Sequence, residues 1–131
     1  MLVRFISLIF LIAFMIYEPR DDSRMLEKQV RSFAIGRVLD MGAGCGIQAL
    51  AALEKTKEVE ACDINEEAVK FVKTKGIKSY KSDLFENVKG KFDVIIFNPP
   101  YLPLDKDEDE ESRVVTTGGE IGYELIDKFL K

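Results

Sequence analysis

The stretch that decides the fold is Asp40-Met41-Gly42-Ala43-Gly44-Cys45-Gly46, in which three glycines alternate with other residues. It begins at the end of Arg37–Met41, a largely apolar run that is typical of a short buried strand. Glycines let the backbone turn sharply and approach a ligand closely. A dinucleotide-binding loop has its third glycine one residue later, where Ile47 stands, so the spacing disfavours NAD. The loop therefore predicts a turn from a strand into a helix beside some other ligand.

From Arg37 onward, short apolar runs alternate with amphipathic stretches, which is the pattern of strand and helix units on a parallel sheet. The expected strands are 37–41, 59–62, 77–80 and 92–97. The expected helices run from about Gly46 to Glu54 with Ile47, Leu50, Ala51 and Leu53 facing the core, from the N-cap Asn65 to Gly76 with Ala68, Val69, Phe71 and Val72 facing the core, and from about Gly119 to Lys131. We therefore predict an α/β fold with a doubly wound, mostly parallel sheet.

Length and composition fit one ordinary folded domain. The 131 residues are 47% apolar and 32% charged, and a net charge of −4 argues against a broad phosphate-binding surface and thus against nucleic acid as a partner. The chain has no histidine, and Cys45 and Cys62 lack the paired spacing of a zinc site, so we expect no metal centre. We expect both thiols to be small buried side chains beside strand ends, in a reducing cytoplasm.

The N-terminal segment is apolar, with an uncharged run from Phe5 to Tyr17. This run is shorter than the roughly 20 residues that a membrane-spanning helix needs. It also lacks the small-residue cleavage site of a signal peptide. We therefore expect neither an anchor nor a signal, a natural start at Met15, and an apolar extension or arm from Met1 to Phe14.

Two aspartates follow later strands at the same edge of the expected sheet. Asp63 lies about 20 residues beyond the first loop glycine, where an acid can accept hydrogen bonds from both hydroxyls of a ribose. Asp83 follows the third strand, where its carboxylate can accept a hydrogen bond from an adenine amino group while Leu84 packs on the ring. Taken singly, Asp63 would be a helix cap and Asp83 a turn residue. Together with the glycine loop they predict a ligand site at the carboxyl ends of adjacent strands.

The order of four motifs, D-x-G-x-G-x-G, D-I-N, S-D-L-F and N-P-P-Y, resembles the motif series of class I S-adenosylmethionine (SAM)-dependent methyltransferases. The resemblance implies the Rossmann-like fold of that family and SAM as cofactor. It also implies that Gly42, Gly44 and Gly46 cradle the methionine part, that Asp63 binds ribose and that Asp83 reads adenine. The same motifs place Asp40, Ile64, Leu84 and Asn98 among the cofactor-binding residues.

The tetrapeptide Asn98-Pro99-Pro100-Tyr101 is the expected catalytic element. An amide or aryl amine nitrogen is a poor nucleophile because its lone pair is delocalised. The side-chain oxygen of Asn98 and the carbonyl of Pro99 can accept both N–H hydrogens and leave the lone pair directed at the methyl group. The prolines make the turn rigid, and Tyr101 offers a face on which the planar substrate group stacks. The element predicts in-line methyl transfer to nitrogen but does not select the substrate.

Two flanking segments narrow the resemblance to glutamine methyltransferases of the HemK/PrmC family. Residues 17–23 resemble the Y-E-P-x-x-D-S/T element of that family, which implies that Tyr17, Pro19 and Asp22 form part of the pocket wall. Residues 118–130 are similar to its G-G-x-x-G-x-x-x-I-D-x-F-L stretch. The resemblance implies methylation of a glutamine in a translation release factor. Without a preceding helical domain, the chain resembles the archaeal and eukaryotic branch, whose members act with a small zinc-binding activator protein.

Other interpretations stay open on the sequence alone. One is an adenine-N6 or guanine-N2 methyltransferase acting on RNA or DNA, against which the acidic run 105–111 argues because phosphate contacts need Lys and Arg. Another is a catalytically silent half-enzyme. The family's fold has seven strands in the order 3-2-1-4-5-7-6, of which the motifs account for four, so we expect the last strands to be missing. The strand at 92–97 would then be an exposed edge that a second copy, a separately encoded remainder or Met1 to Phe14 must cover.

Overall fold

A computed structural model describes residues 19–99, 102–103, 106–107, 109–110 and 117–131, and for 19–22 and 102–103 it describes the backbone alone. The chain divides into two compact units, Met1–Asn98 and Pro99–Lys131. Met1 to Phe14, Tyr17, Pro100 and Tyr101 lie outside the described residues. The predictions made for them are therefore not addressed by the fold.

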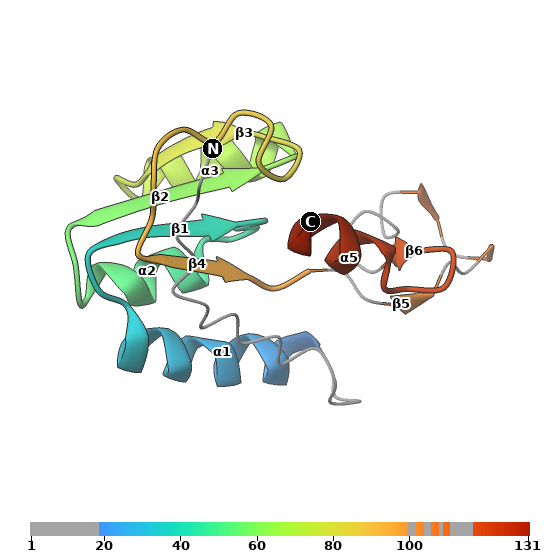
Figure 1. The fold of residues 1–131 in the computed structure, drawn as a ribbon, viewed down its shortest axis with the longest axis horizontal. Coiled ribbons are helices and arrows are strands. Elements are labelled where there is room, and N and C mark those ends of the chain that lie inside the picture. The colour runs from blue at the N-terminus through green and yellow to red at the C-terminus, as the bar shows by residue number, and fades with distance from the viewer. Residues whose placement is uncertain (1–18, 100–101, 104–105, 108, 111–116) are drawn as a thin grey trace. The chain divides into compact units, whose positions relative to one another are not determined.

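The first unit holds a four-stranded parallel sheet in the order β3-β2-β1-β4 (Figure 1). The strands are β1 (Arg37–Met41), β2 (Glu58–Asp63), β3 (Lys78–Lys81) and β4 (Val94–Phe97). All four predicted strands are present, and their order is that of the first four strands of the predicted series. Within the described residues β4 pairs with β1 alone, so it is an edge strand of this sheet as expected. The predicted α/β fold class is confirmed.

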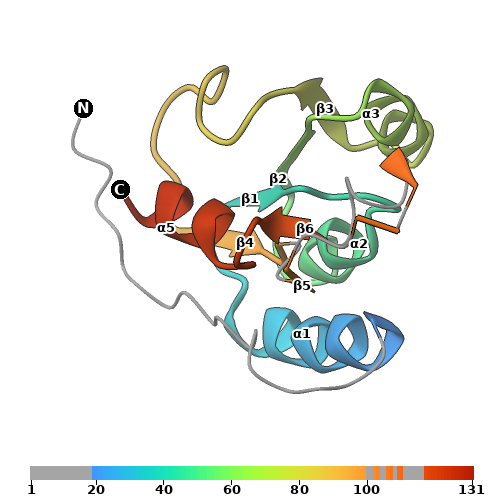
Figure 2. The ribbon, with the colours of Figure 1, turned by 90° about the vertical axis from the view of Figure 1, so that its right-hand side faces the viewer.

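Three helices pack on one face of this sheet, and they are α1 (Pro19–Phe33), α2 (Ile47–Leu53) and α3 (Glu66–Thr74). Figure 2 shows α1 and α2 lying side by side below the sheet. One core cluster joins the three helices to β1, β2 and β4, and its members alternate along each strand as one face of a sheet requires. Its buried residues include Leu26, Val30, Val38, Ala49, Ala51, Val59, Ala61, Val72 and Ile96.

Helix α1 was not predicted, although the sequence holds its signals. Proline is favoured at the first position of a helix, and α1 begins at Pro19. Leu26, Val30 and Ala34 follow at a spacing of four and are all buried. The resemblance assigned residues 17–23 to the pocket wall and carried no prediction of a helix.

The predicted core faces of α2 and α3 are partly wrong. On α2, Leu50 and Leu53 are 39% and 37% exposed, and the buried residues are Gln48, Ala49, Ala51 and Ala52. On α3, Val69 and Val72 are buried as predicted, but Phe71 is 47% exposed. Helix α2 packs against α1 as well as β1 and β2. Apart from Gln48, whose amide donates to α1, the buried residues of α2 are alanines, so small side chains dominate this buried face.

The second unit contains a two-stranded parallel sheet of β5 (Leu102–Pro103) and β6 (Thr117–Gly119), followed by α5 (Glu124–Leu130). The small sheet was not predicted, and the final helix begins later than the predicted Gly119. Gly119 and Gly122 have φ angles of 129° and 113°, which lie outside the helical region. The carboxylate of Glu124 accepts hydrogen bonds from the amides of Ile121 and Gly122 at 2.8 and 2.9 Å, so it fixes this turn before the helix starts.

The prediction that both cysteines are buried is correct for one of them and wrong for the other. Cys62 is buried as expected, but Cys45 is exposed, because it stands on the outer side of the glycine turn instead of in a strand. In the described ranges, no His, Cys, Asp or Glu side chains form a group of three that could hold a metal ion. No helix in those ranges is long and apolar enough to cross a bilayer.

Candidate cofactor site

The glycine loop connects β1 to α2 through three residues with left-handed backbone. The φ angles of Gly42, Gly44 and Gly46 are 67°, 53° and 80°, which side chains rarely permit. A Cβ on Gly46 would also lie 3.1 Å from a methyl carbon of Val72 in α3. The amide of Gly42 donates to the carbonyl of Cys62 at 2.8 Å, which ties the loop to the end of β2. The predicted turn is therefore present, and its conformation requires glycine.

Asp63, the last residue of β2, holds the loop from one side. Its Oδ2 accepts the amide of Gly44 at 2.9 Å and its Oδ1 accepts the amide of Asn65 at 2.9 Å. The cap of α3 is Asn65, whose side chain accepts the amide of Glu67, so Asp63 is not the helix cap. An ionised carboxylate has about four lone-pair sites. Asp63 is partly exposed and keeps acceptor capacity for a ligand.

Asp40 holds the loop from the other side. It is 2% exposed, and its Oδ2 accepts the amide of Ala49 at 2.9 Å. The N-cap of α2 is Gly46, which has no side chain to cap the helix, so Asp40 serves this purpose from within β1. Burial raises the pKa of Asp40 to about 7; the Ala49 hydrogen bond lowers it, and the nearby charge of Asp63 raises it. Two acids thus fix this region, Asp63 at the middle of the loop and Asp40 at the first turn of α2.

Gln48 is a residue of this region that sequence reasoning missed. It is 4% exposed in the first turn of α2, and its Nε2 donates to the carbonyl of Ser23 in α1 at 2.9 Å. Its Oε1 is buried and has no hydrogen-bond partner among the described residues. The available signal was a single amide in the otherwise apolar run Ile47–Leu53.

The loop after β3 is fixed by its own hydrogen bonds. The Ser82 hydroxyl donates to the carbonyl of Leu84 at 2.6 Å and accepts the amide of Asn87 at 3.0 Å. Leu84 has a φ of 49°, and among the described residues it alone has a positive φ without being glycine. Asp83 beside it is exposed. This short loop is a defined structure rather than a simple turn.

The predicted residues of the glycine loop and those that follow β2, β3 and β4 in the first unit lie at the carboxyl ends of the strands. Met41 pairs in register with Cys62 and with Phe97, so the loop lies between the ends of β2 and β4. The amide of Ser82 donates to the carbonyl of Asp63 at 3.0 Å, which joins the third strand end to the second. Ile64 is 53% exposed, Asn98 is exposed at the end of the first unit, and Pro99 begins the second. The backbone of Pro19 and Asp22 lies in the first turn of α1.

Residues 18–117 match the family model described as the methyltransferase small domain. The chain belongs to this methyltransferase family. A Methanocaldococcus jannaschii protein, provisionally named a protein N5-glutamine methyltransferase, is 42% identical over 124 residues, or 88% of this chain and 63% of that protein. The release factor glutamine methyltransferase of Buchnera aphidicola is 29% identical over 85% of this chain and 45% of its own length.

Among solved structures, the methyltransferase small domain resembles that of the E. cuniculi Mtq2-Trm112 complex, described as responsible for methylation of the termination factor eRF1. The TM-score is 0.69 and the identity 29%, over 87% of this chain and 66% of the other. The chain spans less than two thirds of the length of each of these relatives.

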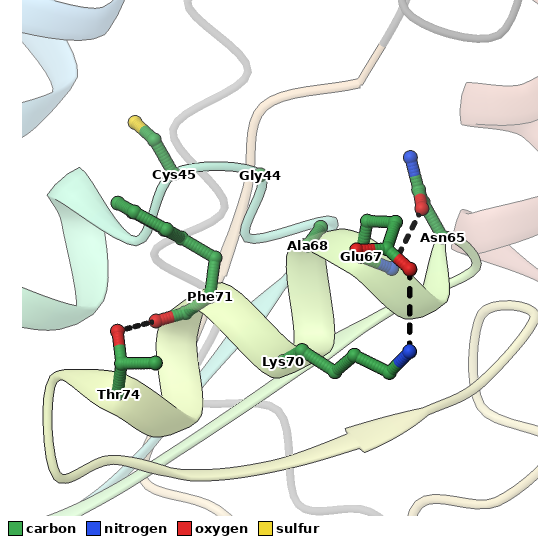
Figure 3. A pocket seen from close by; sticks show the side chains of 8 residues that line it. All are labelled: Gly44, Cys45, Asn65, Glu67, Ala68, Lys70, Phe71 and Thr74. Atoms are coloured by element: carbon green, nitrogen blue, oxygen red, sulfur yellow. Dashed lines mark hydrogen bonds and ion pairs between the residues drawn. The ribbon is translucent and has the colours of Figure 1, made fainter.

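A depression of about 660 Å³ lies on the outer side of α3 in this methyltransferase domain (Figure 3). It shares Gly44 with the glycine loop, and none of the aspartates predicted to bind the cofactor is among its lining residues. It therefore borders the candidate cofactor site at Gly44. Its lining residues are Gly44, Cys45, Asn65, Glu67, Ala68, Lys70, Phe71 and Thr74.

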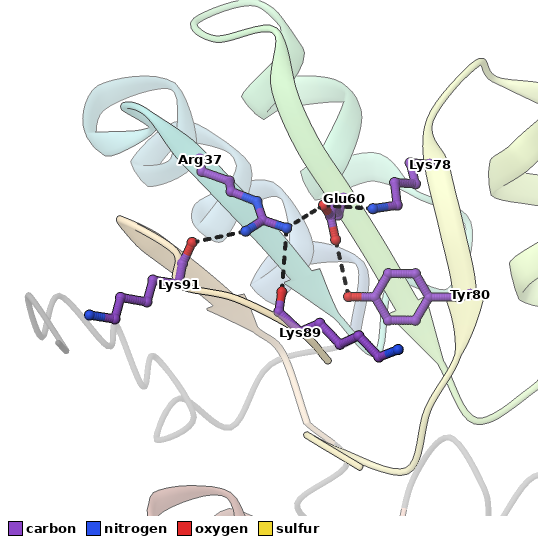
Figure 4. A network of polar contacts seen from close by, with 6 residues as sticks. All are labelled: Arg37, Glu60, Lys78, Tyr80, Lys89 and Lys91. Atoms are coloured by element: carbon purple, nitrogen blue, oxygen red, sulfur yellow. Dashed lines mark hydrogen bonds and ion pairs between the residues drawn. The ribbon is translucent and has the colours of Figure 1, made fainter. Parts of the chain in front are cut away.

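A polar network lies in the half of the methyltransferase sheet that is nearer the amino ends of its strands (Figure 4). Glu60 accepts hydrogen bonds from Arg37 at 2.6 Å, from Lys78 at 3.0 Å and from Tyr80 at 3.2 Å. Burial alone would raise the pKa of Glu60, but the hydrogen bonds from Arg37 and Lys78 outweigh it and the pKa is lowered. The guanidinium of Arg37 also lies 4.3 Å from the ring centre of Phe92. The network joins three strands and the segment before β4.

Proposed function

We propose that this chain is the cofactor-binding and catalytic part of a SAM-dependent N-methyltransferase that modifies the side-chain amide of a glutamine in a translation release factor. The observation that carries the proposal is the glycine loop held between Asp40 and Asp63 at the strand ends. This is where open α/β sheets bind ligands. The similarity to glutamine methyltransferases supports the choice of acceptor.

The residues present fit SAM. The left-handed glycines carry no side chain, and a Cβ on Gly44 would meet nothing within 4 Å, so a ligand can approach the loop backbone closely. Asp63 keeps lone pairs for ribose hydroxyls, and Leu84 holds an apolar side chain beside Asp83 for an adenine ring. SAM supplies a methyl group activated on a sulfonium. The proposed cofactor-binding residues are Tyr17, Pro19, Asp22, Asp40, Gly42, Gly44, Gly46, Asp63, Ile64, Asp83, Leu84 and Asn98.

The proposed catalytic residues follow β4, the strand that neighbours the glycine loop. Phe97 pairs with Met41, so Asn98 and Gly42 come one residue beyond paired positions. The amide oxygen of Asn98 and the carbonyl of Pro99 accept the two N–H hydrogens of the substrate amide and stabilise positive charge as it grows on nitrogen. Pro100 keeps the turn rigid and Tyr101 stacks on the planar amide.

The proposal extends to partners. The E. cuniculi relative was solved as a complex and is described as methylating eRF1. We propose that this chain likewise acts on a release factor in the cytoplasm with a small zinc-binding activator protein. Because β4 is an edge strand in the described residues, we also propose that a second copy, a separately encoded remainder or the arm Met1 to Phe14 lies against it.

The test is transfer of a tritiated methyl group from SAM to a release factor, with and without the activator. Label should enter the wild-type factor and not a factor whose Gly-Gly-Gln glutamine is replaced. Transfer RNA and DNA serve as competing acceptors. Label in nucleic acid would favour the base-methyltransferase alternative, and no transfer to any acceptor would favour a silent half-enzyme.

A further inference from the structure

The ring of Phe97 lies against the glycine loop. A Cβ placed on Gly42 would be 3.6 Å from Cε2 and 3.9 Å from Cδ2 of Phe97. Apart from the chain neighbours of Gly42, no other described residue comes within 4 Å of that position. Phe97 is half-buried and Gly42 is exposed, so the ring and the loop backbone both contribute to the open surface at this point. A ligand that lies beside Gly42 can therefore contact the ring.

Phe97 stands between the two tasks proposed for this end of the sheet. It is the last residue of β4, pairs in register with Met41 and directly precedes Asn98. In the proposed function, Gly42 lies beside the methionine part of SAM and Asn98 holds the acceptor nitrogen. The sulfonium joins the methionine part to the methyl group, so it belongs between these two residues, on the surface that contains the ring.

The chemistry of a sulfonium limits which side chain can stabilise it. This cation has no N–H or O–H hydrogen to donate, so it does not form ordinary hydrogen bonds. A carboxylate or thiolate beside it could itself accept the methyl group. An aromatic ring attracts a cation through the negative charge on its face and does not react with the methyl group. S-adenosylhomocysteine, the product, has a neutral thioether at the same place and gains no such attraction.

We propose that Phe97 is a specificity-determining residue of the cofactor site, whose ring makes a cation–π contact with the sulfonium of SAM and thereby favours SAM over S-adenosylhomocysteine. The proposal rests on the proposed function. Because the attraction disappears with the positive charge, the contact helps fresh SAM to replace the product after each turnover. It also explains an aromatic residue at the end of β4, whose other residues are valine and isoleucine.

Fluorination of the ring tests the contact with little change of shape. Phenylalanine that carries one, two or three fluorine atoms is placed at position 97 of the full chain, and calorimetry measures affinity for SAM and for S-adenosylhomocysteine. Each fluorine withdraws negative charge from the ring face. The affinity for SAM should fall stepwise, by about fivefold in all, while that for S-adenosylhomocysteine changes less than about twofold. The same series at Phe33, the last residue of α1, is the matched control and should change neither affinity.

Two substitutions give an independent measurement. Phe97→Leu removes the ring and should lower the ratio of the two affinities, SAM over S-adenosylhomocysteine, about fivefold. Phe97→Tyr keeps a ring and should retain the wild-type ratio. If thermal unfolding shows that the leucine variant does not fold, the fluorinated series decides alone.

Three outcomes would overturn the proposal. Equal weakening of both ligands by Phe97→Leu would mean that the ring only packs against Gly42. A SAM affinity that is unaffected by fluorine would exclude a cation–π contact, and a tyrosine variant that behaves like the leucine variant would exclude it as well. A wild-type chain that binds neither ligand, alone or with the activator protein, refutes the proposed function itself.

Discussion

The half of the parallel sheet at the amino ends of its strands and the half at their carboxyl ends each bury an acid. The surroundings shift the pKa values of these two acids in opposite directions. Glu60 meets three donors, two of them cationic, and its pKa is lowered despite burial. Asp40 meets one backbone amide and, among the described residues, no ion pair, and burial raises its pKa to about 7. At the amino ends of the strands, side chains of the sheet itself supply the hydrogen bonds and opposite charges that the buried acid needs. The half at the glycine loop leaves charge and hydrogen-bonding capacity unmet, as expected where a ligand completes the site.

The largest expected effect is on turnover. It tests whether catalysis takes place at the carboxyl ends of the strands. Asn98→Ala should lower kcat on the order of 100-fold or more, because it removes an acceptor directed at developing charge. Because Asn98 is also a proposed cofactor-binding residue, affinity for S-adenosylhomocysteine should fall, but far less than kcat, and the melting temperature should stay near that of the wild type. The measurement is methyl transfer to a release factor with activator, beside calorimetry and thermal unfolding.

Asn65→Ala is the matched control for this change. It removes the side-chain cap of α3 and should cost about 1 kcal/mol of stability with turnover altered only a few fold. Near-normal kcat in the Asn98 variant would remove this residue from the proposed catalytic element.

The second prediction concerns the pH dependence of stability at Asp40. A folded pKa raised to about 7 means that Asp40 favours folding at low pH, and that this contribution is lost as pH rises from about 4 through 7. Asp40→Asn keeps an acceptor for Ala49 and does not titrate. From pH 5 to pH 8 the variant should therefore gain about 2–3 kcal/mol relative to wild type. Urea unfolding at both pH values measures this, and parallel pH profiles would show that Asp40 is not the titrating group.

The third prediction contrasts two aspartates at opposite ends of the sheet. Asp63→Ala should weaken S-adenosylhomocysteine binding by about 1–3 kcal/mol, because loop amides and ligand hydroxyls lose their acceptor. Asp93 accepts the amide of Arg37 at the other end, and Asp93→Ala should leave ligand affinity unchanged while lowering stability. Calorimetry that finds equal affinities for the Asp63 variant and the wild type would exclude Asp63 from the site.

The last prediction concerns the network of Figure 4, where the smallest effect is expected for Lys78. Glu60→Ala should cost about 1–3 kcal/mol of stability, since Arg37 and Tyr80 lose a buried partner. Lys78→Ala should cost at most about 1 kcal/mol, because the Lys78 side chain is 69% exposed and solvent screens its charge. The lowered pKa means that Glu60 stabilises above pH of about 4.5 and that this contribution falls away in acid. Denaturant unfolding at pH 7 would contradict this account if both variants lost the same stability.

The strands and the glycine loop could be predicted because each depends on local sequence. The apolar residues Val38 and Leu39 are fully buried in β1, which lies between β2 and β4 in the parallel sheet. The φ angles of Gly42 and Gly46 are set by the turn itself. The residues that could bind a cofactor followed from these strand ends, and their assignment to a ligand remains a prediction.

The helix faces could not be predicted because they depend on packing partners. Leu50 fits a helical period but is 39% exposed, since the buried face of α2 is the one that contacts α1 and the sheet, and Gln48 and three alanines occupy it. Phe71 likewise lines an open depression instead of the core. The burial of Gln48 depends on the hydrogen bond from its side chain to the Ser23 carbonyl in α1. The sequence around Gln48 alone does not show that α1 lies beside it.

Leu84 imposes a trade-off between folding and recognition. A left-handed backbone costs a residue with a side chain roughly 1–2 kcal/mol, and glycine would avoid that cost. Glycine would also remove the apolar side chain that the proposed adenine contact needs. With leucine at this position, the Ser82 hydroxyl donates to the Leu84 carbonyl and holds the strained backbone in place. The loop is therefore less stable than with glycine but presents an apolar side chain at the proposed site. A stabilised variant selected only for heat resistance would be expected to accept glycine here and to lose part of its hold on the cofactor.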